Sequence, residues 1–362
     1  MKLKVPCIAA LLAALACAPL SPGPAAAQTQ DAAPEHSAIR TFEYIYTDAP
    51  YPQSHASTIV QTRAGTIAAA WFGGTRERNP DVEIWFARRS ADGWETPRSV
   101  ANGVQEDGTR QPTWNPVLFQ DPAGPLLLFY KVGPSPQEWW GEVVTSDDGG
   151  ESWGTPRRLP DGILGPIKNK PVILQDGSWL SPSSTEKGDV WQIHFERSTD
   201  RGKTWIATPP VDRGPNFDAI QPSILFTANG ELQAVGRSRQ GVVASTFSKD
   251  GGETWRPLIA IDLPNPNSGT DAVTLKDGRQ LIVYNHSAHS PEEAAKGTRY
   301  PLNVGISEDG VHWQNVLTLA SEPIASGYAY PAVIQSDDGL VHITYTEGRR
   351  RIRHLVLDPS AL

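Results

Sequence analysis

Residues 146–153 read Ser-Asp-Asp-Gly-Gly-Glu-Ser-Trp, and the same spelling, Ser-x-Asp-x-Gly-x-Ser/Thr-Trp, returns at residues 198–205 and 248–255. A copy one residue shorter lies at 307–313, and a degraded copy lies at 90–94. The aspartates of the five copies are Asp92, Asp148, Asp200, Asp250 and Asp309. In such a boxed turn the serine and aspartate accept backbone N–H groups, the glycine adopts a positive φ, and the tryptophan packs over the turn. The spelling therefore predicts a repeated β-hairpin, in which these aspartates are structural and not catalytic.

A second repeat alternates with the boxed turns: a polar residue, an apolar run, a turn that contains glycine, and another apolar run. Its six copies begin at His55, Asn115, Lys170, Gln221, Asp271 and Tyr330. Each copy is typical of a two-stranded hairpin. We therefore predict an all-β fold, a six-bladed β-propeller of four-stranded antiparallel blades. Residues 352–357 would supply the third strand of the last blade and residues 41–46 its outer strand, so that radial closure protects the sheet edges.

The six residues that open the second repeat are all polar, although each precedes an apolar strand. One such residue can be a satisfied polar group at a strand end, but six at equivalent positions around a channel mouth favour a site. The ends of the second strands add Arg76, Tyr130, Lys131, Arg237, Arg239, His286, Glu347 and Arg349 to the same mouth. Converging arginines suit a carboxylate-bearing sugar, because guanidinium and carboxylate geometries match. Ordinary solvated surface charge is the alternative for some of these arginines.

The boxed repeat resembles the Asp-box, or BNR repeat, of the sialidase superfamily, and the resemblance covers nearly all of residues 41–362. The segments that resemble a divergent sialidase-like subgroup are residues 54–58, 72–75, 80–82, 114–118, 165–171, 263–269 and 330–333. The resemblance implies a six-bladed propeller that hydrolyses terminal sialic acids without a metal or cofactor. It also implies an arginine triad on the substrate carboxylate, a tyrosine nucleophile activated by a glutamate, and an aspartate acid/base.

Individual residues match this implied machinery. Tyr330 lies where the nucleophile is expected, and Tyr328 is a less favoured alternative. Asp81 lies where the acid/base is expected, in competition with Glu83. The residues that match triad arginines are Arg299 and either Arg237 or Arg239.

Two positions depart from the implied pattern. His55 stands where an arginine is expected, and Gln221 stands where the glutamate partner of the tyrosine is expected. A glutamine side chain cannot act as a general base. A tyrosine with an ordinary pKa of about 10 needs another activator to react at neutral pH, and His55 or His286 could provide it.

The first functional hypothesis is an exo-acting glycoside hydrolase that removes a terminal anionic sugar such as sialic acid. Tyr330 would attack, with His55 and Gln221 beside it, and Asp81 would protonate the leaving oxygen. The expected substrate-binding residues are Arg237, Arg239, Arg299, Lys170, Asp271, Asn115, Arg76 and His286.

Two other functions stay open. A polysaccharide lyase acting on a uronate-containing glycan would use His55 or Tyr330 as the general base for β-elimination. A non-catalytic glycan-binding propeller would need only the boxed repeats. We expect no metal, because the spacing of His286 and His289 suits ligands but no third ligand accompanies them.

The N-terminus has the pattern of an export signal over residues 1–27, followed by a flexible segment over residues 28–40. Lys2 and Lys4 precede an apolar run, and three alanines at 25–27 offer a cleavage site. Both cysteines, Cys7 and Cys17, lie within this signal. We therefore expect a periplasmic or secreted monomer without disulfides, with lipid anchoring at Cys17 as a less favoured alternative.

The net charge of −8, with no basic stripe along the chain, argues against nucleic acid as a partner. We expect no transmembrane segment, because the apolar run of the signal is too short to cross a bilayer comfortably. The expected partner is an anionic glycan, which would be recognised by a local group of cations.

Overall fold

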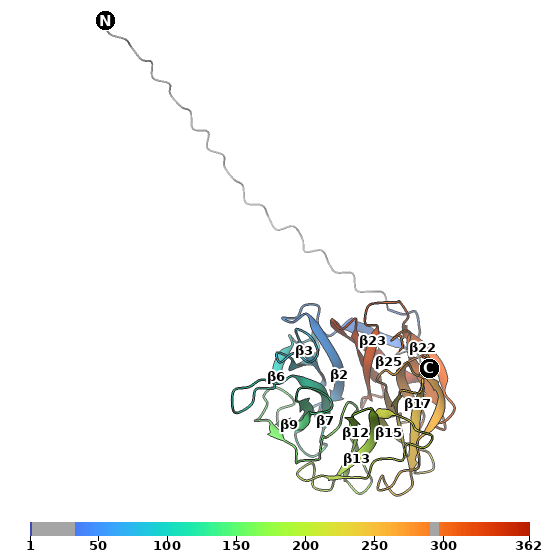
Figure 1. The fold of residues 1–362 in the computed structure, drawn as a ribbon. Coiled ribbons are helices and arrows are strands. Elements are labelled where there is room, and N and C mark those ends of the chain that lie inside the picture. The colour runs from blue at the N-terminus through green and yellow to red at the C-terminus, as the bar shows by residue number, and fades with distance from the viewer. Residues whose placement is uncertain (2–32, 290–296) are drawn as a thin grey trace. The chain divides into compact units, whose positions relative to one another are not determined.

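The computed structural model describes Met1, residues 33–289 and residues 297–362. The export signal expected over residues 1–27 lies, apart from Met1, outside the described residues. Residues Ala33–Leu362 form one compact unit of six antiparallel sheets, which Figure 1 shows arranged around a central axis. Within the described ranges the helical structure is limited to the short 3-10 helix Pro359–Ala361. The six sheets confirm the predicted six-bladed β-propeller.

The first three blades follow one another along the chain. Blade one contains β2 (Gln53–Gln61), β3 (Ile67–Gly74), β4 (Glu83–Ser90), β5 (Gly93–Trp94) and β6 (Arg98–Ala101), the last two both pairing with β4. Blade two contains β7 (Thr113–Gln120), β8 (Leu126–Val132), β9 (Trp140–Ser146) and β10 (Arg157–Arg158). Blade three contains β11 (Val172–Ile173), β12 (Trp179–Lys187), β13 (Val190–Ser198) and β14 (Ile206–Ala207).

The last three blades include the one that closes the ring. Blade four contains β15 (Ala219–Phe226), β16 (Leu232–Ser238), β17 (Val242–Ser248) and β18 (Ile259–Pro264). Blade five contains β19 (Asp271–Thr274), β20 (Gln280–Asn285), β21 (Leu302–Ser307) and β22 (Gln314–Ala320). Blade six contains β23 (Tyr328–Gln335), β24 (Val341–Glu347), β25 (Arg351–Leu357) and, from the N-terminal part, β1 (Ile39–Tyr44). The pairing of β1 with β25 confirms the predicted closure, and β1 begins two residues before the expected start of the propeller at residue 41.

The boxed turn at residues 146–153 is held by its own side chains. Ser146 Oγ accepts the N–H of Gly150 (2.7 Å) and donates to Asp148 (2.7 Å). The Asp148 carboxylate accepts the N–H of Ser152 (2.9 Å). The same bonds recur around Asp200 and Asp250. These aspartates are satisfied turn residues, as predicted.

Three of the box tryptophans connect neighbouring blades. Each packs on a phenylalanine of the preceding blade, in β4, β8 or β13. The pairs are Trp153–Phe86, Trp205–Phe129 and Trp255–Phe195, with ring centres 5.3, 6.1 and 3.9 Å apart. Such aromatic pairs contribute about 0.5–1.5 kcal/mol each beyond the area that they bury. The boxed turns therefore also stabilise the packing of each blade against the preceding one.

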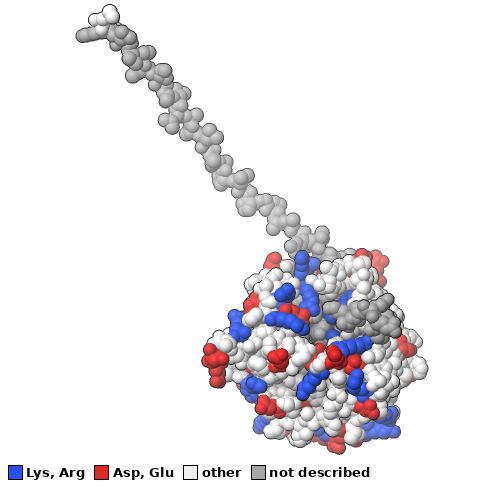
Figure 2. Space-filling model, in the orientation of Figure 1, with Lys and Arg blue, Asp and Glu red and all other residues white. Residues whose placement is uncertain are grey.

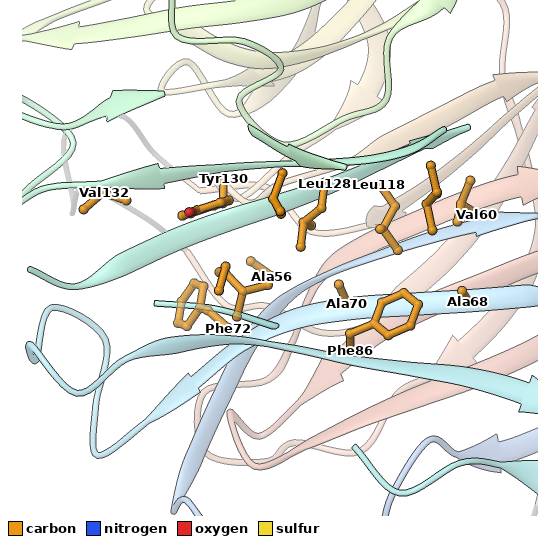
Figure 3. Packing of buried hydrophobic residues seen from close by; sticks show 14 of the residues in the cluster. Ala56, Val60, Ala68, Ala70, Phe72, Phe86, Leu118, Leu128, Tyr130 and Val132 are labelled. Atoms are coloured by element: carbon orange, nitrogen blue, oxygen red, sulfur yellow. The ribbon is translucent and has the colours of Figure 1, made fainter. Parts of the chain in front are cut away.

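The hydrophobic core lies between adjacent blades, as Figure 3 shows for blades one and two. The labelled side chains of blade one are Ala56, Val60, Ala68, Ala70, Phe72 and Phe86. They face Leu118, Leu128, Tyr130 and Val132 of blade two. Because each sheet buries both faces against its neighbours, the middle strands β3 and β8 are buried along their whole length. The apolar runs of the second repeat therefore form the core that packs the blades together.

A buried polar network joins blade six to blade one where the ring closes. Glu43 in β1 accepts hydrogen bonds from Arg89 Nε (2.8 Å) and Trp94 Nε1 (3.0 Å) of blade one. Glu43 also bonds to His354 Nδ1 (2.9 Å), and His354 Nε2 lies 3.1 Å from His342 Nδ1. Burial alone would raise the pKa of Glu43, but its bonds to His354 and Arg89 outweigh this effect and lower the pKa to about 2. Burial lowers the pKa of His342 to about 4 and also lowers the pKa of His354.

We expect this network to make the protein less stable in acid. Both histidines bind protons more readily in the unfolded chain, so their contribution falls as the pH drops below about 6.5, and that of Glu43 falls below about 4.5. His342 alone should account for about 2–3 kcal/mol of unfolding free energy between neutral pH and pH 4. Urea unfolding at several pH values measures this loss. His342→Gln should flatten it, whereas the same change at exposed His286 should not, and equal slopes would contradict the assignment.

Candidate active site

Tyr330 in β23 forms the centre of a polar cluster at the start of blade six. Its hydroxyl oxygen accepts hydrogen bonds from Gln221 Nε2 (3.2 Å) and from Arg237 Nη1 (3.2 Å). Arg237 Nη1 also donates to Gln221 Oε1 (3.3 Å). Because a guanidinium only donates, this contact fixes which end of the amide faces the tyrosine. The three residues that the sequence analysis placed together in the site are therefore in contact.

A β-bulge in the first strand of four blades determines which side chains reach this cluster. The bulged residues with positive φ are Ala56, Asn115, Gln221 and Tyr330, at 56°, 33°, 57° and 52°. Non-glycine residues in this region are strained, by about 1–3 kcal/mol each, and bulges of this kind often turn side chains toward functional sites. The equivalent of Gln221 and Tyr330 in blade one is thus Ala56. His55 lies one residue earlier, which corrects the predicted ring of equivalent residues.

His55 nevertheless packs directly against Tyr330. The two ring centres are 4.3 Å apart, and Phe72 covers His55 edge-on at 5.6 Å. The imidazole is buried, and its Nδ1 has no hydrogen-bond partner among the described residues. Burial lowers the pKa of His55 well below its usual value, and the charges of Arg349 and Arg299 lower it further. His55 is therefore a neutral imidazole with an unpaired nitrogen.

Cations from three further blades surround the Tyr330 ring. The distances to its centre are 5.5 Å for Lys168 Nζ, 5.9 Å for the Arg237 guanidinium and 5.8 Å for the Arg299 guanidinium. Burial lowers the pKa of Arg299 to about 10, with the charge of Arg237 acting in the same direction. Positive charges held together in this way are energetically costly unless an anion joins them. The cluster is therefore suited to bind a negatively charged group.

Lys168 stabilises the backbone around the cluster through its hydrogen bonds. It was not predicted as a site residue. Its Nζ donates to Asn169 Oδ1 (2.8 Å) and to the carbonyl oxygens of Thr270 (3.0 Å) and Pro331 (2.7 Å). Burial lowers the pKa of Lys168 to about 7. Asn169 Nδ2 donates to the carbonyl of Gln221 (2.9 Å). The residue pair 168–169 thus holds the bulges of blades four and six in place. The sequence feature that could have indicated this role is the presence of a lysine at 168 within a largely apolar stretch.

The segment that leads to Lys168 is fixed by two buried charged residues. The Glu196 carboxylate accepts the N–H groups of Leu164 (2.8 Å) and Gly165 (2.6 Å). Lys131 Nζ donates to the carbonyl of Pro166 (2.8 Å). Burial lowers the pKa of Lys131 to about 7, although the charge of Glu196 opposes this. Lys131, expected at the mouth, therefore acts as a support.

Lys170 and Asp271 form an ion pair that links neighbouring blades, which we call the inter-blade clamp. Lys170 Nζ donates to both Asp271 oxygens (3.1 and 3.0 Å). Asp271 also accepts from Ser223 Oγ (2.8 Å) and from the N–H of Val333 (2.8 Å). These contacts join blades three, four, five and six around one carboxylate that is 2% exposed. The substrate-binding role expected for both residues stays a prediction that these contacts do not favour, because their polar atoms are already paired with one another and with their neighbours.

Asp81, the predicted acid/base, lies in the exposed loop after β3. Its Oδ2 accepts from the Thr75 N–H (2.9 Å) and from Thr75 Oγ1 (2.7 Å). Partial burial would raise the pKa of Asp81, but the two bonds from Thr75 outweigh it and the pKa lies below its usual value. Its neighbour Arg76 is exposed, and the competing Glu83 forms an ion pair with Arg110. The assignment of Asp81 as a proton donor stays a prediction that this environment does not favour.

The other predicted binding residues have separate surroundings. The Arg239 guanidinium stacks on Trp191 at 4.1 Å, and Arg239 Nη1 donates to the carbonyl of Asp189 (2.7 Å). Arg237 contacts the same Trp191 ring at 5.1 Å. His286 is exposed, and its Nδ1 lies 2.5 Å from the Tyr284 hydroxyl. Asn115 is buried at the bulge of blade two. Of these four predicted residues, Arg237 in β16 and Arg239, one residue after the end of β16, share a tryptophan.

The described residues show neither a metal site nor a membrane-spanning helix. They contain no group of three or more His, Cys, Asp and Glu side chains arranged to hold a metal ion. Among them, no helix is long and apolar enough to cross a membrane.

On the face shown in Figure 2, basic and acidic side chains lie close together around the centre. The charged character of the molecule near its axis is thus mixed rather than uniformly positive.

Comparison with known proteins places the chain in a family. Residues 65–343, which are more than half of the chain, match the family model of the BNR repeat-like domain. The chain belongs to the BNR repeat-like family. Among curated proteins, this family member is 23% identical over 223 residues to an anhydrosialidase of Macrobdella decora. That match covers 55% of this chain and only 28% of the anhydrosialidase.

Solved structures share the fold of this BNR repeat-like protein. A protein of unknown function from Dyadobacter fermentans has a TM-score of 0.71 at 19% identity, with 88% of this chain and 98% of that chain covered. The Hadza microbial sialidase Hz136 has a TM-score of 0.71 at 17% identity, with 86% of this chain and 67% of that chain covered. At these identities the similarity shows the propeller fold alone.

Proposed function

We propose that this protein is an exo-acting glycoside hydrolase that removes a terminal anionic sugar, such as sialic acid, from glycans. The observation that carries the proposal is the position of the Tyr330 hydroxyl, between Gln221 and Arg237 and among several cations. An oxygen nucleophile beside a group of guanidinium ions is the arrangement that cleavage of a carboxylate-bearing glycoside needs. The names of the sialidase relatives point to the same class of substrate.

In this proposal, the sugar carboxylate is held by Arg237, Arg299 and Arg349. Arg349 already pairs with Glu77 through Nη1, so its guanidinium would be shared between the Glu77 and sugar carboxylates. Arg349 provides the positive charge of the arginine that the family resemblance implies in blade one, at the position where this sequence has His55. The carbonyl of Arg349 accepts the N–H of Ser54 (2.9 Å), which brings this residue next to His55. Its charge is the largest electrostatic contribution of any neighbour to the lowered pKa of His55. In this proposal the third arginine of the site therefore comes from the turn that follows β24 in blade six.

Gln221 takes a different part in the reaction from the glutamate that the resemblance implies. Its Nε2 donates to Tyr330, as does Arg237, so two N–H groups point at the oxygen that forms and breaks the bond to the sugar. Such donors stabilise the negative charge that this oxygen carries when the bond to the sugar breaks again. Gln221 therefore assists the departure of tyrosine and does not remove its proton.

A panel of aryl glycosides tests the proposal. Aglycone release is measured from aryl glycosides of sialic acid and of uronic acids, with an aryl galactoside as the neutral control. Release that depends on the carboxylate of the sugar supports the proposal. Tight glycan binding without release from any substrate would identify the protein as a binding module instead.

A lyase acting on a uronate-containing glycan is the second candidate, and the unpaired Nδ1 of His55 is the observation that favours it. A neutral imidazole beside Tyr330 can accept the proton next to a sugar carboxylate that the arginines hold. The elimination product contains a carbon–carbon double bond and absorbs in the ultraviolet. Digestion of uronate polymers followed by absorbance and mass spectrometry separates this product from a hydrolysed sugar.

Arg349→Met is expected to lower kcat/KM for a carboxylate substrate by about 10- to 150-fold, mainly through KM. The reason is the loss of one charge-assisted hydrogen bond, which contributes about 1.5–3 kcal/mol. The matched control is Arg350→Met, because Arg350 is the exposed neighbour. The two variants and the wild type are compared by initial rates on the same aryl glycoside. Equal effects of both changes would exclude Arg349 from carboxylate binding.

A further inference from the structure

Glu186 lies at the end of β12 and faces the arginines of blade four. In the antiparallel pair β12–β13 its direct partner is Trp191. The Trp191 ring lies 5.1 Å from the Arg237 guanidinium and 4.1 Å from that of Arg239. Directly opposite residues of an antiparallel pair point to the same face of the sheet. Glu186 therefore projects beside Trp191 toward Arg237, whose Nη1 donates to the Tyr330 hydroxyl.

The carboxyl group of Glu186 is half-buried and has no hydrogen bond or ion pair with the described residues. Burial raises the pKa of Glu186 above its usual value. The charges of Arg237, Arg239 and Arg78 oppose this rise, and the charge of Glu77 adds to it. Arg78 and Glu77 belong to the loop after β3, so charges from blades one and four act on this carboxyl of blade three. It is an unpaired acid at the edge of the Tyr330 cluster.

Glu186 and Asp81 thus have opposite environments. The bonds from Thr75 hold Asp81 in its charged form, whereas the surroundings of Glu186 favour the form that still carries a proton. Two carboxyl groups whose environments shift them apart are how active sites separate proton donors from charge stabilisers. Of the two, Glu186 is the one whose surroundings shift it toward the form that can donate a proton.

We propose that Glu186 is the general acid that protonates the leaving oxygen of the glycoside. The proposal rests on the hydrolase function and assigns a catalytic residue on a different blade from Asp81. In the first step the bonding pair of the glycosidic C–O bond moves to the leaving oxygen, which takes the Glu186 proton. Tyr330 bonds to the anomeric carbon, and its phenolic proton passes to water.

The second step returns both residues to their starting forms. A water molecule attacks the anomeric carbon and gives a proton to the Glu186 carboxylate. The bond to Tyr330 breaks with its electron pair on the phenolic oxygen, which then takes a proton from water. The sum of the two steps is one glycoside and one water consumed, with one free sugar and one alcohol formed.

The test compares Glu186→Gln with wild type on glycosides of one anionic sugar that differ only in the acidity of the leaving alcohol. A leaving group that departs without protonation, such as nitrophenolate, should lose less than about tenfold in kcat/KM. An alkyl or sugar leaving group should lose about 10²–10⁴-fold, the usual contribution of a general acid. The alkaline limb of the pH–rate profile should disappear in the same variant. Glu186→Asp, which keeps a proton donor, should retain a dependence on leaving group close to that of the wild type.

Two further variants complete the design. Glu322→Gln changes an exposed glutamate outside the cluster and is expected to behave as wild type. Asp81→Asn is expected to keep the wild-type dependence on leaving group. If Asp81→Asn shows the steep dependence, the acid is Asp81; if Glu186→Gln slows all glycosides equally, Glu186 only positions Arg237. Either result overturns the proposal while leaving the hydrolase function intact, whereas a wild-type protein that releases no aglycone overturns both.

Discussion

Tyr330→Phe is expected to lower kcat/KM on an aryl glycoside of the anionic sugar by about a thousandfold or more, with little change in stability. Removing an enzyme's nucleophile typically causes losses of this order or greater, because the remaining groups act only together with it. The change deletes one oxygen atom and keeps the ring, so the contact with His55 at 4.3 Å and the bulge at φ 52° can persist. Gln221 and Arg237 lose an acceptor but keep their own hydrogen bond of 3.3 Å.

The measurement is aglycone release at saturating and limiting substrate, together with thermal unfolding of each variant. Tyr328→Phe is the discriminating variant, because Tyr328 is the less favoured candidate for the nucleophile and packs edge-on against Tyr345. Activity should survive Tyr328→Phe. If activity survives Tyr330→Phe and is lost in Tyr328→Phe, the nucleophile is Tyr328 and not Tyr330. Survival in both variants would remove a tyrosine nucleophile from the mechanism.

Asp271→Ala is expected to lower the free energy of unfolding by about 3–5 kcal/mol. Removing one partner of a buried ion pair leaves the other charge uncompensated, and here Lys170 would lose its carboxylate. The hydroxyl of Ser223 and the N–H of Val333 would lose their acceptor as well. Because these groups belong to four different blades, the loss should affect cooperative unfolding of the whole propeller rather than one hairpin.

Urea denaturation followed by tryptophan fluorescence measures this effect. Asp337→Ala removes an exposed carboxylate of the β23–β24 turn and serves as the control, with an expected change within about 0.5 kcal/mol. An unchanged midpoint for Asp271→Ala combined with a raised KM would show that Asp271 binds substrate, as the sequence analysis expected. A lowered midpoint with a normal KM for the folded fraction would establish the clamp.

The sequence predicted the fold well because the decisive information is local. A boxed turn is closed by bonds among residues four apart or fewer, such as Ser146 with Gly150 and Asp148 with Ser152. The strand β1 was predicted only to within two residues, because its partner β25 lies more than 300 residues away and its outer edge has few neighbours. The ends of such a strand depend on its pairing with a distant segment and not on its own amino-acid sequence.

The site was predicted in part. Tyr330 and Gln221, which open two repeats, lie close to Arg237 and Arg299, as the repeats and the family resemblance together implied. The sequence analysis did not include Lys168 or Glu186, the residue that we propose as the general acid, since neither stands at the first position of a repeat. Glu186 stands at the end of the second strand of blade three, where other blades supplied candidates, so the same rule applied to every blade would have included it.

The amino-acid sequence by itself determined the number of blades, their strand order and the closure of the ring, because five boxed turns alternate with six apolar hairpins along the chain. Only the tertiary structure decided that His55 lies one residue before the bulge of its strand and that Asp271 has partners from three other blades. The register of a bulge shifts a side chain by one position and thereby turns it to another face, and the sequence of one strand does not specify that register. The partners of a buried charge come from blades about 50 residues or more apart, so their pairing is a property of the assembled ring.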